Sequence, residues 1–83
     1  MTLKVELVSP TARVWSGEAT SVSTRTIEGD IGILTDHTPL FAVLVDGKVV
    51  IHGINGENTE FSVSGGFLSV ANNRVSILTE SVN

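Results

Sequence analysis

The sequence contains no cysteine, so neither a disulfide nor a thiolate metal site can hold this chain together. That composition is compatible with a reducing compartment. Long apolar runs are also missing, and none approaches the roughly 18 residues that a membrane-spanning helix needs. The start reaches the acidic Glu6 before any long apolar stretch, so we expect no signal peptide. With 83 residues, we predict a single domain over residues 1–83.

Charge is scarce as well, and its sign is unbalanced. Only 17% of the residues are charged, below the roughly 25% of an ordinary soluble domain, and the net charge is −4. A negative field repels phosphate groups, so we expect no nucleic-acid partner and no direct attraction to anionic membrane surfaces. The low charge has two interpretations: an all-β composition rich in Val, Ile and Thr, or a surface that an assembly covers.

The sequence motifs of common enzymes are absent too. Neither the phosphate-binding loop GxxxxGK[ST] nor the nucleophile elbow GxSxG occurs, and residues 29–32 supply only two glycines of a dinucleotide fingerprint. The two histidines, His37 and His52, lie far apart and belong to no recognised metal-ligand spacing. We therefore predict no catalytic residue, no metal and no cofactor.

Two polar residues in predicted loops have simple interpretations. His37 has no identifiable nucleophile or orienting partner for base catalysis, so we interpret it as a loop histidine that hydrogen-bonds the local backbone. A place at a protein interface is a further possibility for it. Asp30 reads as a lone carboxylate on a turn, and such a group is usually only solvated.

Alternating apolar and polar residues predict strands along the whole chain. Leu3, Val5 and Leu7 alternate with polar residues, as in a half-buried strand. Asp46-Gly47 and Asn55-Gly56 are signals of two-residue hairpins. Such closely spaced turn signals predict an all-β sandwich or barrel. No window of a dozen residues sustains a helical apolar period, so we predict no substantial helix.

Some details of the strands can also be predicted. Ser16-Gly17 separates a short strand over residues 12–15 from a second one over residues 18–27. The apolar run over residues 40–45 is typical of a strand that is buried on both faces. We assign all three phenylalanines to the core: Phe41, Phe61 and Phe67.

Several segments, in order and at near-constant spacing, resemble one protein family. Residues 28–40, EGDIGILTDHTPL, resemble its EGxxGIxPxHxPL stretch. Residues 46–51, DGKVVI, resemble its strand after a turn glycine, and residues 64–78, SGGFLSVANNRVSIL, resemble its GGFLxVxxNxVxVLA ending. The chain is thus similar, over nearly its whole length, to the N-terminal domain of the epsilon subunits of bacterial and chloroplast ATP synthases.

This resemblance implies both a fold and a role. The fold is a flattened β-sandwich of about ten short, mostly antiparallel strands. The role is a non-catalytic rotor subunit that links the gamma subunit to the c-ring and couples proton flow to ATP synthesis, while the beta subunits catalyse the reaction. The membrane is touched only peripherally, through the complex. The expected location is the cytoplasmic face of a bacterial plasma membrane, with the stromal side of a thylakoid as a less favoured option.

The resemblance also implies two sets of contact residues. The set expected to face the c-ring is Glu28, Gly29, Asp30, Ile31 and Gly32. The set expected to face gamma is His37, Thr38, Pro39, Leu40 and Ala42.

Two departures from the family pattern qualify these expectations. Thr35 stands where the family usually has proline, so the loop before His37 is expected to be less rigid. The sequence ends at Asn83, where the family usually continues into a helical hairpin that inhibits ATP hydrolysis and, in some members, binds ATP. Neither property is expected of these 83 residues.

Two other classes of function remain open. The first is a free-standing β-sandwich module that binds a small ligand or a peptide, and the second is an enzyme. A generic module has no need for the particular order of residues 28–40, and an enzyme needs a catalytic constellation that the sequence does not show.

Overall fold

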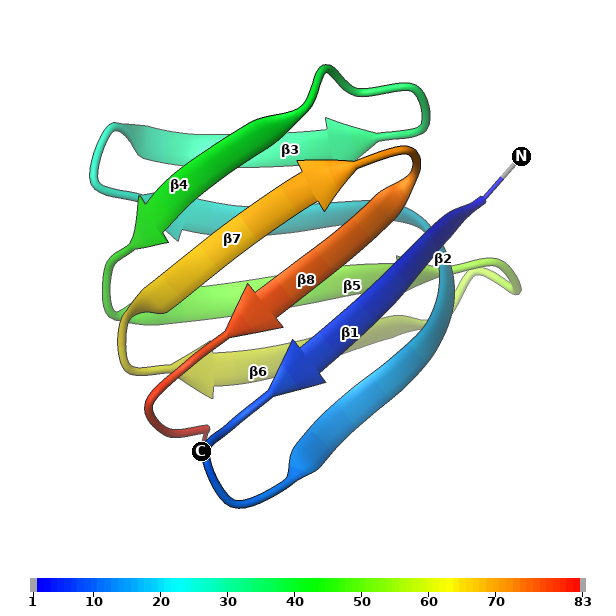
Figure 1. Ribbon diagram of the computed structural model, residues 1–83. Coiled ribbons are helices and arrows are strands. Elements are labelled where there is room, and N and C mark those ends of the chain that lie inside the picture. The colour runs from blue at the N-terminus through cyan, green and yellow to red at the C-terminus, as the bar shows by residue number, and fades with distance from the viewer. Residues whose placement is uncertain (1, 83) are drawn as a thin grey trace.

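The computed structural model describes residues 2–82, which form β-strands in two facing layers (Figure 1). No helix occurs over these described residues, and hence none that is long and apolar enough to cross a membrane. The prediction of an all-β fold is therefore confirmed. The strands are β1 (Leu3–Val8), β2 (Arg13–Thr26), β3 (Gly29–Leu34), β4 (Leu40–Leu44), β5 (Gly47–Gly53), β6 (Asn58–Val63), β7 (Gly66–Ala71) and β8 (Arg74–Leu78).

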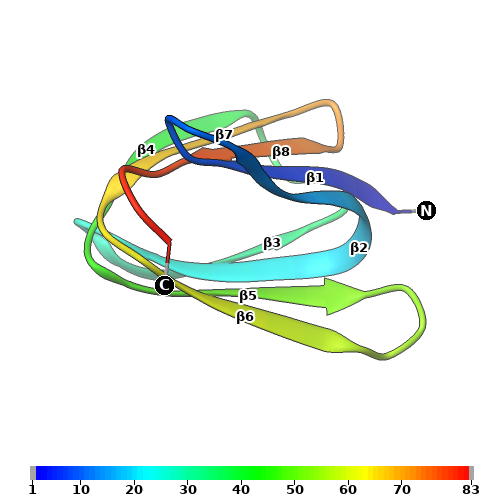
Figure 2. The same cartoon turned by 90° about the horizontal axis from the view of Figure 1, so that it is seen from below.

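Each layer contains four strands in a simple order. In one layer, β1 pairs in parallel with β8, and β8–β7 and β7–β4 pair antiparallel. In the other layer, β3, β2, β5 and β6 lie side by side and are all antiparallel. Figure 2 shows the two layers edge-on. The described strands number eight rather than the expected ten or so, and they form the predicted flattened sandwich.

Strand β2 joins the two layers, because it is long enough to take part in both. Its first half pairs with β1, from Val8↔Arg13 to Leu3↔Ala19, and its second half pairs with β3 and β5. The far end of β2 also bridges to β4 through Thr26↔Leu44. The layers are thus hydrogen-bonded to each other along both sides of the sandwich.

The prediction of two separate strands over residues 12–15 and 18–27 is therefore wrong. The chain stays extended through Ser16-Gly17 because Val5 of β1 pairs directly with Gly17. The glycine also makes room for an aromatic ring: a Cβ on Gly17 would lie 3.1 Å from Cη2 of Trp15. This glycine serves packing and does not end the strand.

The core lies between the layers and is built from the inward-facing residue of each alternating pair. Leu3, Val5 and Leu7 are fully or almost fully buried, as their alternation predicts. Phe61 packs against the core, in agreement with its assignment. The other buried apolar residues are Ala19, Val22, Ile33, Leu44, Val49, Ile51, Val63, Leu68, Val70, Val75 and Ile77.

The core assignment is wrong for the other two phenylalanines. Phe41 is 67% exposed and Phe67 is 48% exposed, and their rings stack on the outer face with centroids 5.5 Å apart. The reason is that β4 is not buried on both faces, because only its inner face meets the other layer. Leu40, Ala42 and Leu44 point inward, and the residues between them point to solvent.

The two hairpin signals differ in outcome. Asn55-Gly56 lies in the turn of the β5–β6 hairpin, so the hairpin is confirmed. Its loop is longer than the predicted two residues, because Gly53 N bonds Glu57 O and leaves residues 54–56 in the loop. Asp46-Gly47 does not close a hairpin, because β4 pairs with β7 while β5 pairs with β2 and β6. The chain uses this turn to cross from one layer to the other. A turn signal is local, whereas the choice of partner strand depends on the whole sheet.

Gly66 is the glycine on which this fold depends most. Its φ is +124°, and a Cβ there would collide with the carbonyl oxygen of Leu78 and lie 2.8 Å from Cα of Thr79. Any side chain would push β7 away from the end of β8.

We therefore predict that Gly66→Ala lowers the free energy of unfolding by about 3 kcal/mol or more, since it adds left-handed strain to a backbone clash. The matched control is Gly32→Ala, which has no heavy atom within 4 Å of the new Cβ and should change stability by less than about 0.5 kcal/mol. Urea unfolding followed by tryptophan fluorescence measures both. Equal stability of the two variants would contradict the role of Gly66.

Candidate interaction surfaces

The residues predicted to face the c-ring occupy the β2–β3 turn and the start of β3. Glu28, Gly29, Asp30 and Gly32 are exposed, and Ile31 is half-buried against the core. The turn is shaped from inside by the buried Thr26, a residue that the sequence analysis did not single out. Its Oγ1 accepts a hydrogen bond from Glu28 N (3.1 Å) and donates one to Gly29 O (3.0 Å).

The signal that could have indicated Thr26 is its position directly before the turn. A threonine hydroxyl there can bond the backbone of the residues that follow, in place of a ladder partner. Because this anchor is buried, the turn presents the charged side chain of Glu28 on a fixed backbone.

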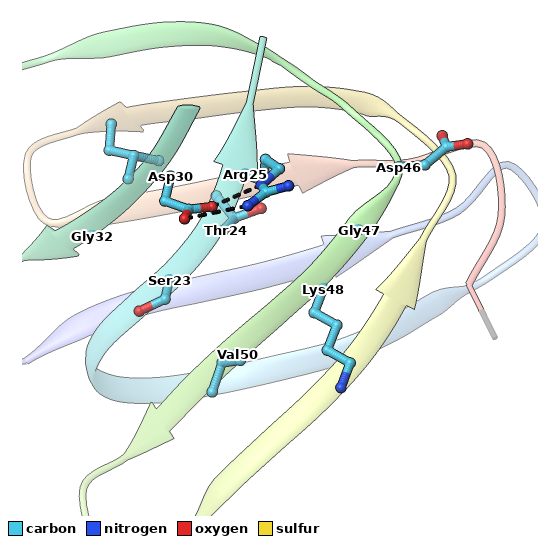
Figure 3. A pocket seen from close by; sticks show the side chains of 10 residues that line it. Ser23, Thr24, Arg25, Asp30, Gly32, Asp46, Gly47, Lys48 and Val50 are labelled. Carbon is cyan, nitrogen blue, oxygen red and sulfur yellow. Dashed lines mark hydrogen bonds and ion pairs between the residues drawn. The ribbon is translucent and has the colours of Figure 1, made fainter. Parts of the chain in front are cut away.

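Asp30 is not the lone solvated carboxylate that its turn position suggested. It faces Arg25 across the β2–β3 ladder, with 2.9 Å between Arg25 Nε and Asp30 Oδ1 and 3.5 Å between Nη2 and Oδ2 (Figure 3). The hydrogen bond from Arg25, helped by its positive charge, lowers the pKa of the Asp30 carboxyl and raises the pKa of the guanidinium. Both side chains are well exposed, so solvent screens the pair and it contributes little to stability.

An open polar groove runs beside this ion pair. It forms where β5 leaves β2 beyond the Ser23↔Val50 pair, and its floor and walls include Ser23, Arg25, Asp30, Lys48 and Val50. The Nζ atom of Lys48 in turn lies 3.4 Å from Oε1 of Glu60 on β6. The charges in the groove are therefore largely matched within the chain, and the described residues bring together no group of three potential metal ligands.

The residues predicted to face gamma lie at the other end of β3, in the β3–β4 loop and on β4. His37 Nδ1 is 2.6 Å from the carbonyl oxygen of Thr38, which places the proton on Nδ1 and agrees with the interpretation of a local backbone bond. Thr38 and Pro39 are exposed. Leu40 and Ala42 are half-buried and pack against the core.

Two side chains of β4 point to solvent, and they alternate along the strand with the predicted residues Leu40 and Ala42. Phe41 and Val43 stand beside Phe67 of β7, which in turn pairs with Leu78 of β8. All four are exposed, and we call Phe41, Val43, Phe67 and Leu78 the outer apolar face. The sequence could not reveal it, because a continuous apolar run does not show which residues point inward.

The structure does not bring the two predicted sets together. The c-ring set begins at one end of β3 and the gamma set follows its other end. A strand rises by about 3.3 Å per residue, so the two loops are separated by roughly 17 Å along β3. The chain therefore offers two separate surfaces and not one site.

The ion pair leads to a prediction on protonation. Because the folded chain lowers the pKa of Asp30, the pair stabilises the fold above the ordinary pKa of aspartate, and this contribution is lost as the pH falls through the lowered value. Arg25→Gln should therefore raise the pKa of Asp30 toward its ordinary value, whereas Lys48→Gln should leave it unchanged. Carboxyl-carbon NMR titration measures both. The same midpoint in Arg25→Gln as in the unaltered chain would refute the assignment.

Comparison with known proteins gives a consistent result. Residues 2–83 match the family model of the ATP synthase Delta/Epsilon chain, beta-sandwich domain. The ATP synthase epsilon chain of Streptomyces avermitilis is 50% identical over 78 residues, which cover 94% of this chain and 63% of that one. The epsilon chain of Micrococcus luteus is 48% identical over 79 residues, which cover 95% of this chain and 87% of that one. This chain thus spans less than two thirds of the length of the Streptomyces relative.

Solved structures show the same fold at lower identity. A chain of the mitochondrial ATP synthase of Euglena gracilis superposes with a TM-score of 0.94 at 23% identity, over 99% of this chain and 52% of that one. A chain from the central stalk and c-ring of the mitochondrial ATP synthase of Tetrahymena thermophila gives 0.82 at 18% identity, over 100% of this chain and 66% of that one. Fold, length of match and identity agree, and the chain belongs to the family of ATP synthase delta and epsilon chains, of which it forms the β-sandwich domain.

Proposed function

We propose that this chain is a non-catalytic subunit of the central stalk of a proton-translocating ATP synthase, where it links the gamma subunit to the c-ring and couples proton flow to ATP synthesis. The observation that carries the proposal is the similarity, at 50% and 48% identity, to proteins named ATP synthase epsilon chain. The structural neighbours, which come from assemblies with a c-ring and a central stalk, support it.

In this proposal the chain itself performs no chemistry, which belongs to the beta subunits. It needs no metal and no cofactor, and it meets the membrane only through the complex. The two epsilon chains named above, at 50% and 48% identity, come from bacteria, which supports a place at the cytoplasmic face of a bacterial plasma membrane and not at the stromal side of a thylakoid.

The outer apolar face supports a gamma-facing surface on β4 and its neighbours. Of the predicted set, His37, Thr38 and Pro39 offer a polar loop, while Leu40 and Ala42 hold β4 against the core. The face beside them supplies the apolar area that this loop lacks, and an apolar cluster of this kind marks an interaction surface in a soluble domain. Full burial of one such large side chain stabilises a complex by about 1.5–3 kcal/mol.

The turn around Glu28 supports the c-ring-facing surface. Its backbone is fixed by Thr26, and its exposed side chains are the carboxylates of Glu28 and Asp30 together with the apolar Ile27. The two carboxylates suit a polar partner, as the loops of a c-ring are. The outer apolar face carries no charged side chain, so the two surfaces differ in chemistry as well as in place.

Binding to a matched gamma subunit tests the first surface. Phe41→Ser removes the most exposed ring of the outer apolar face, and we expect it to weaken gamma binding by about 30-fold, the effect of losing a hot spot of about 2 kcal/mol. The control is Ile54→Ser, which removes an apolar side chain that is 50% exposed on the β5–β6 turn, away from this face. Calorimetric titration with gamma measures both. If the unaltered chain does not bind gamma, the proposed function is lost.

Charge reversal tests the second surface. We expect Asp30→Arg to reduce ATP-driven proton pumping in reconstituted membranes severalfold without unfolding the domain, since it places a positive charge at the proposed c-ring contact. Two controls accompany this variant. Asp30→Asn removes the ion pair with Arg25 without introducing a positive charge, so it shows the effect of losing the pair alone. Glu57→Arg makes the same charge reversal on the distant β5–β6 turn. Pumping by Asp30→Arg equal to that of Glu57→Arg would remove Asp30 from the surface.

A further inference from the structure

Asn73 joins three segments that are far apart in the sequence. It lies in the β7–β8 turn, and its side-chain Oδ1 accepts a hydrogen bond from Asp36 N in the β3–β4 loop, at 2.6 Å. Its own carbonyl oxygen accepts a bond of 2.8 Å from Lys4 N at the start of β1. In Figure 1 this turn and the β3–β4 loop lie beside each other at one end of the sandwich.

The β3–β4 loop has little else to fix its backbone. Outside the strand ladders, no backbone–backbone hydrogen bond of the described residues involves residues 35–39. Asp36 has a φ of +62°, a conformation that non-glycine residues adopt only when their surroundings enforce it. The 2.6 Å bond to the side chain of Asn73 holds Asp36 in this conformation from outside the loop.

We propose that Asn73 is a positioning residue for the gamma-facing loop. Its side chain keeps the loop in one conformation, so that His37, Thr38 and Pro39 meet gamma already ordered and less conformational entropy is lost on binding. This inference rests on the proposed function, because it assumes that gamma is the partner of the loop. The inference goes beyond the predicted gamma-facing set, because Asn73 lies outside that loop, 37 positions away in the sequence from Asp36.

The turn explains why an asparagine can do this. Asn72 and Asn73 have φ values of +51° and +60°, as a type I′ hairpin turn requires, and asparagine and glycine are the residues that accept them. Glycine would make the turn equally well but has no side chain to reach Asp36. The side-chain tie is therefore separable from the turn itself.

This separation defines the experiment, which uses the full chain and its matched gamma subunit. Asn73→Gly keeps the turn and removes the tie, and Asn72→Gly changes the same turn at a residue with no side-chain hydrogen bond among those of residues 2–82. We expect Asn73→Gly to speed amide hydrogen exchange at Asp36 about tenfold and to weaken gamma binding about five- to tenfold, the effect of one hydrogen bond. Asn72→Gly should change neither by more than about twofold.

Two further variants exclude a general loss of stability. The double change Asn73→Asp with Asp36→Asn swaps the two side chains, so that an oxygen acceptor again faces the amide of residue 36 without adding charge, and it should restore both exchange and binding. Ile51→Val removes one methyl group from the buried core of β5. This change lowers the free energy of unfolding by about 0.5–1.5 kcal/mol, and it should leave gamma binding unchanged.

The outcomes are distinct. If Asn73→Gly binds gamma as tightly as the unaltered chain, or if exchange at Asp36 does not change, the role of Asn73 is overturned while the proposed function stands. If the unaltered chain does not bind gamma, the proposed function itself fails, and the role of Asn73 in presenting the loop fails with it.

Discussion

The continuous pairing of β2 is the constraint on which the rest of the structure depends. A chain of 83 residues without cysteine has no covalent staple, so its two layers must be held by hydrogen bonds and by the core alone. β2 pairs with β1 in one layer, with β3 and β5 in the other, and with β4 at its far end. Because one strand belongs to both layers, they cannot slide apart without breaking ladders on both sides. Gly17 allows this continuity, since it pairs with β1 where the ring of Trp15 leaves little room for a side chain.

Closing the sandwich in this way has a consequence for the surface. Every strand has two faces, and in a domain of two thin layers only one face of each can be buried. On the layer of β3, β2, β5 and β6 the outer face carries charges that match one another, such as Arg25 with Asp30 and Lys48 with Glu60. On the layer of β4, β7 and β8 it carries the outer apolar face instead. Other exposed apolar side chains, those of Ile27, Leu34 and Ile54, lie outside this face, whereas Phe41, Val43, Phe67 and Leu78 adjoin one another on it. A contiguous apolar cluster of this kind favours a surface covered by an assembly over a general effect of β composition.

Much of this fold could be predicted from the sequence, where the signal is local. The alternation of Leu3, Val5 and Leu7 and the Asn55-Gly56 turn gave β1 and the β5–β6 hairpin. The predictions that failed depend on how the strands pair, which no single segment shows. The apolar run over residues 40–45 conceals its alternation, Asp46-Gly47 does not reveal that β4 pairs with β7, and the Arg25–Asp30 pair needs the β2–β3 register. The same holds for the candidate surfaces. The loops were proposed from their motifs, and Thr26 acts on residues two and three positions ahead, which a local pattern can indicate. Asn73 acts on a loop 37 positions away, and no local pattern shows that contact.

In the proposed role, the two surfaces suit the mechanical task of a rotor subunit. They lie at opposite ends of β3, so torque between a partner at Glu28 and a partner at His37 would pass along this strand. The ladder bonds between β3 and β2 are perpendicular to the strands, so a pull along β3 loads them together in shear and not one after another. The weak points are then the loops at both ends, which have no ladder of their own. It is there that the side chains of Thr26 and Asn73 bond the backbone, at Glu28 N and Asp36 N, and these bonds tie each loop to the end of a strand or to a neighbouring turn.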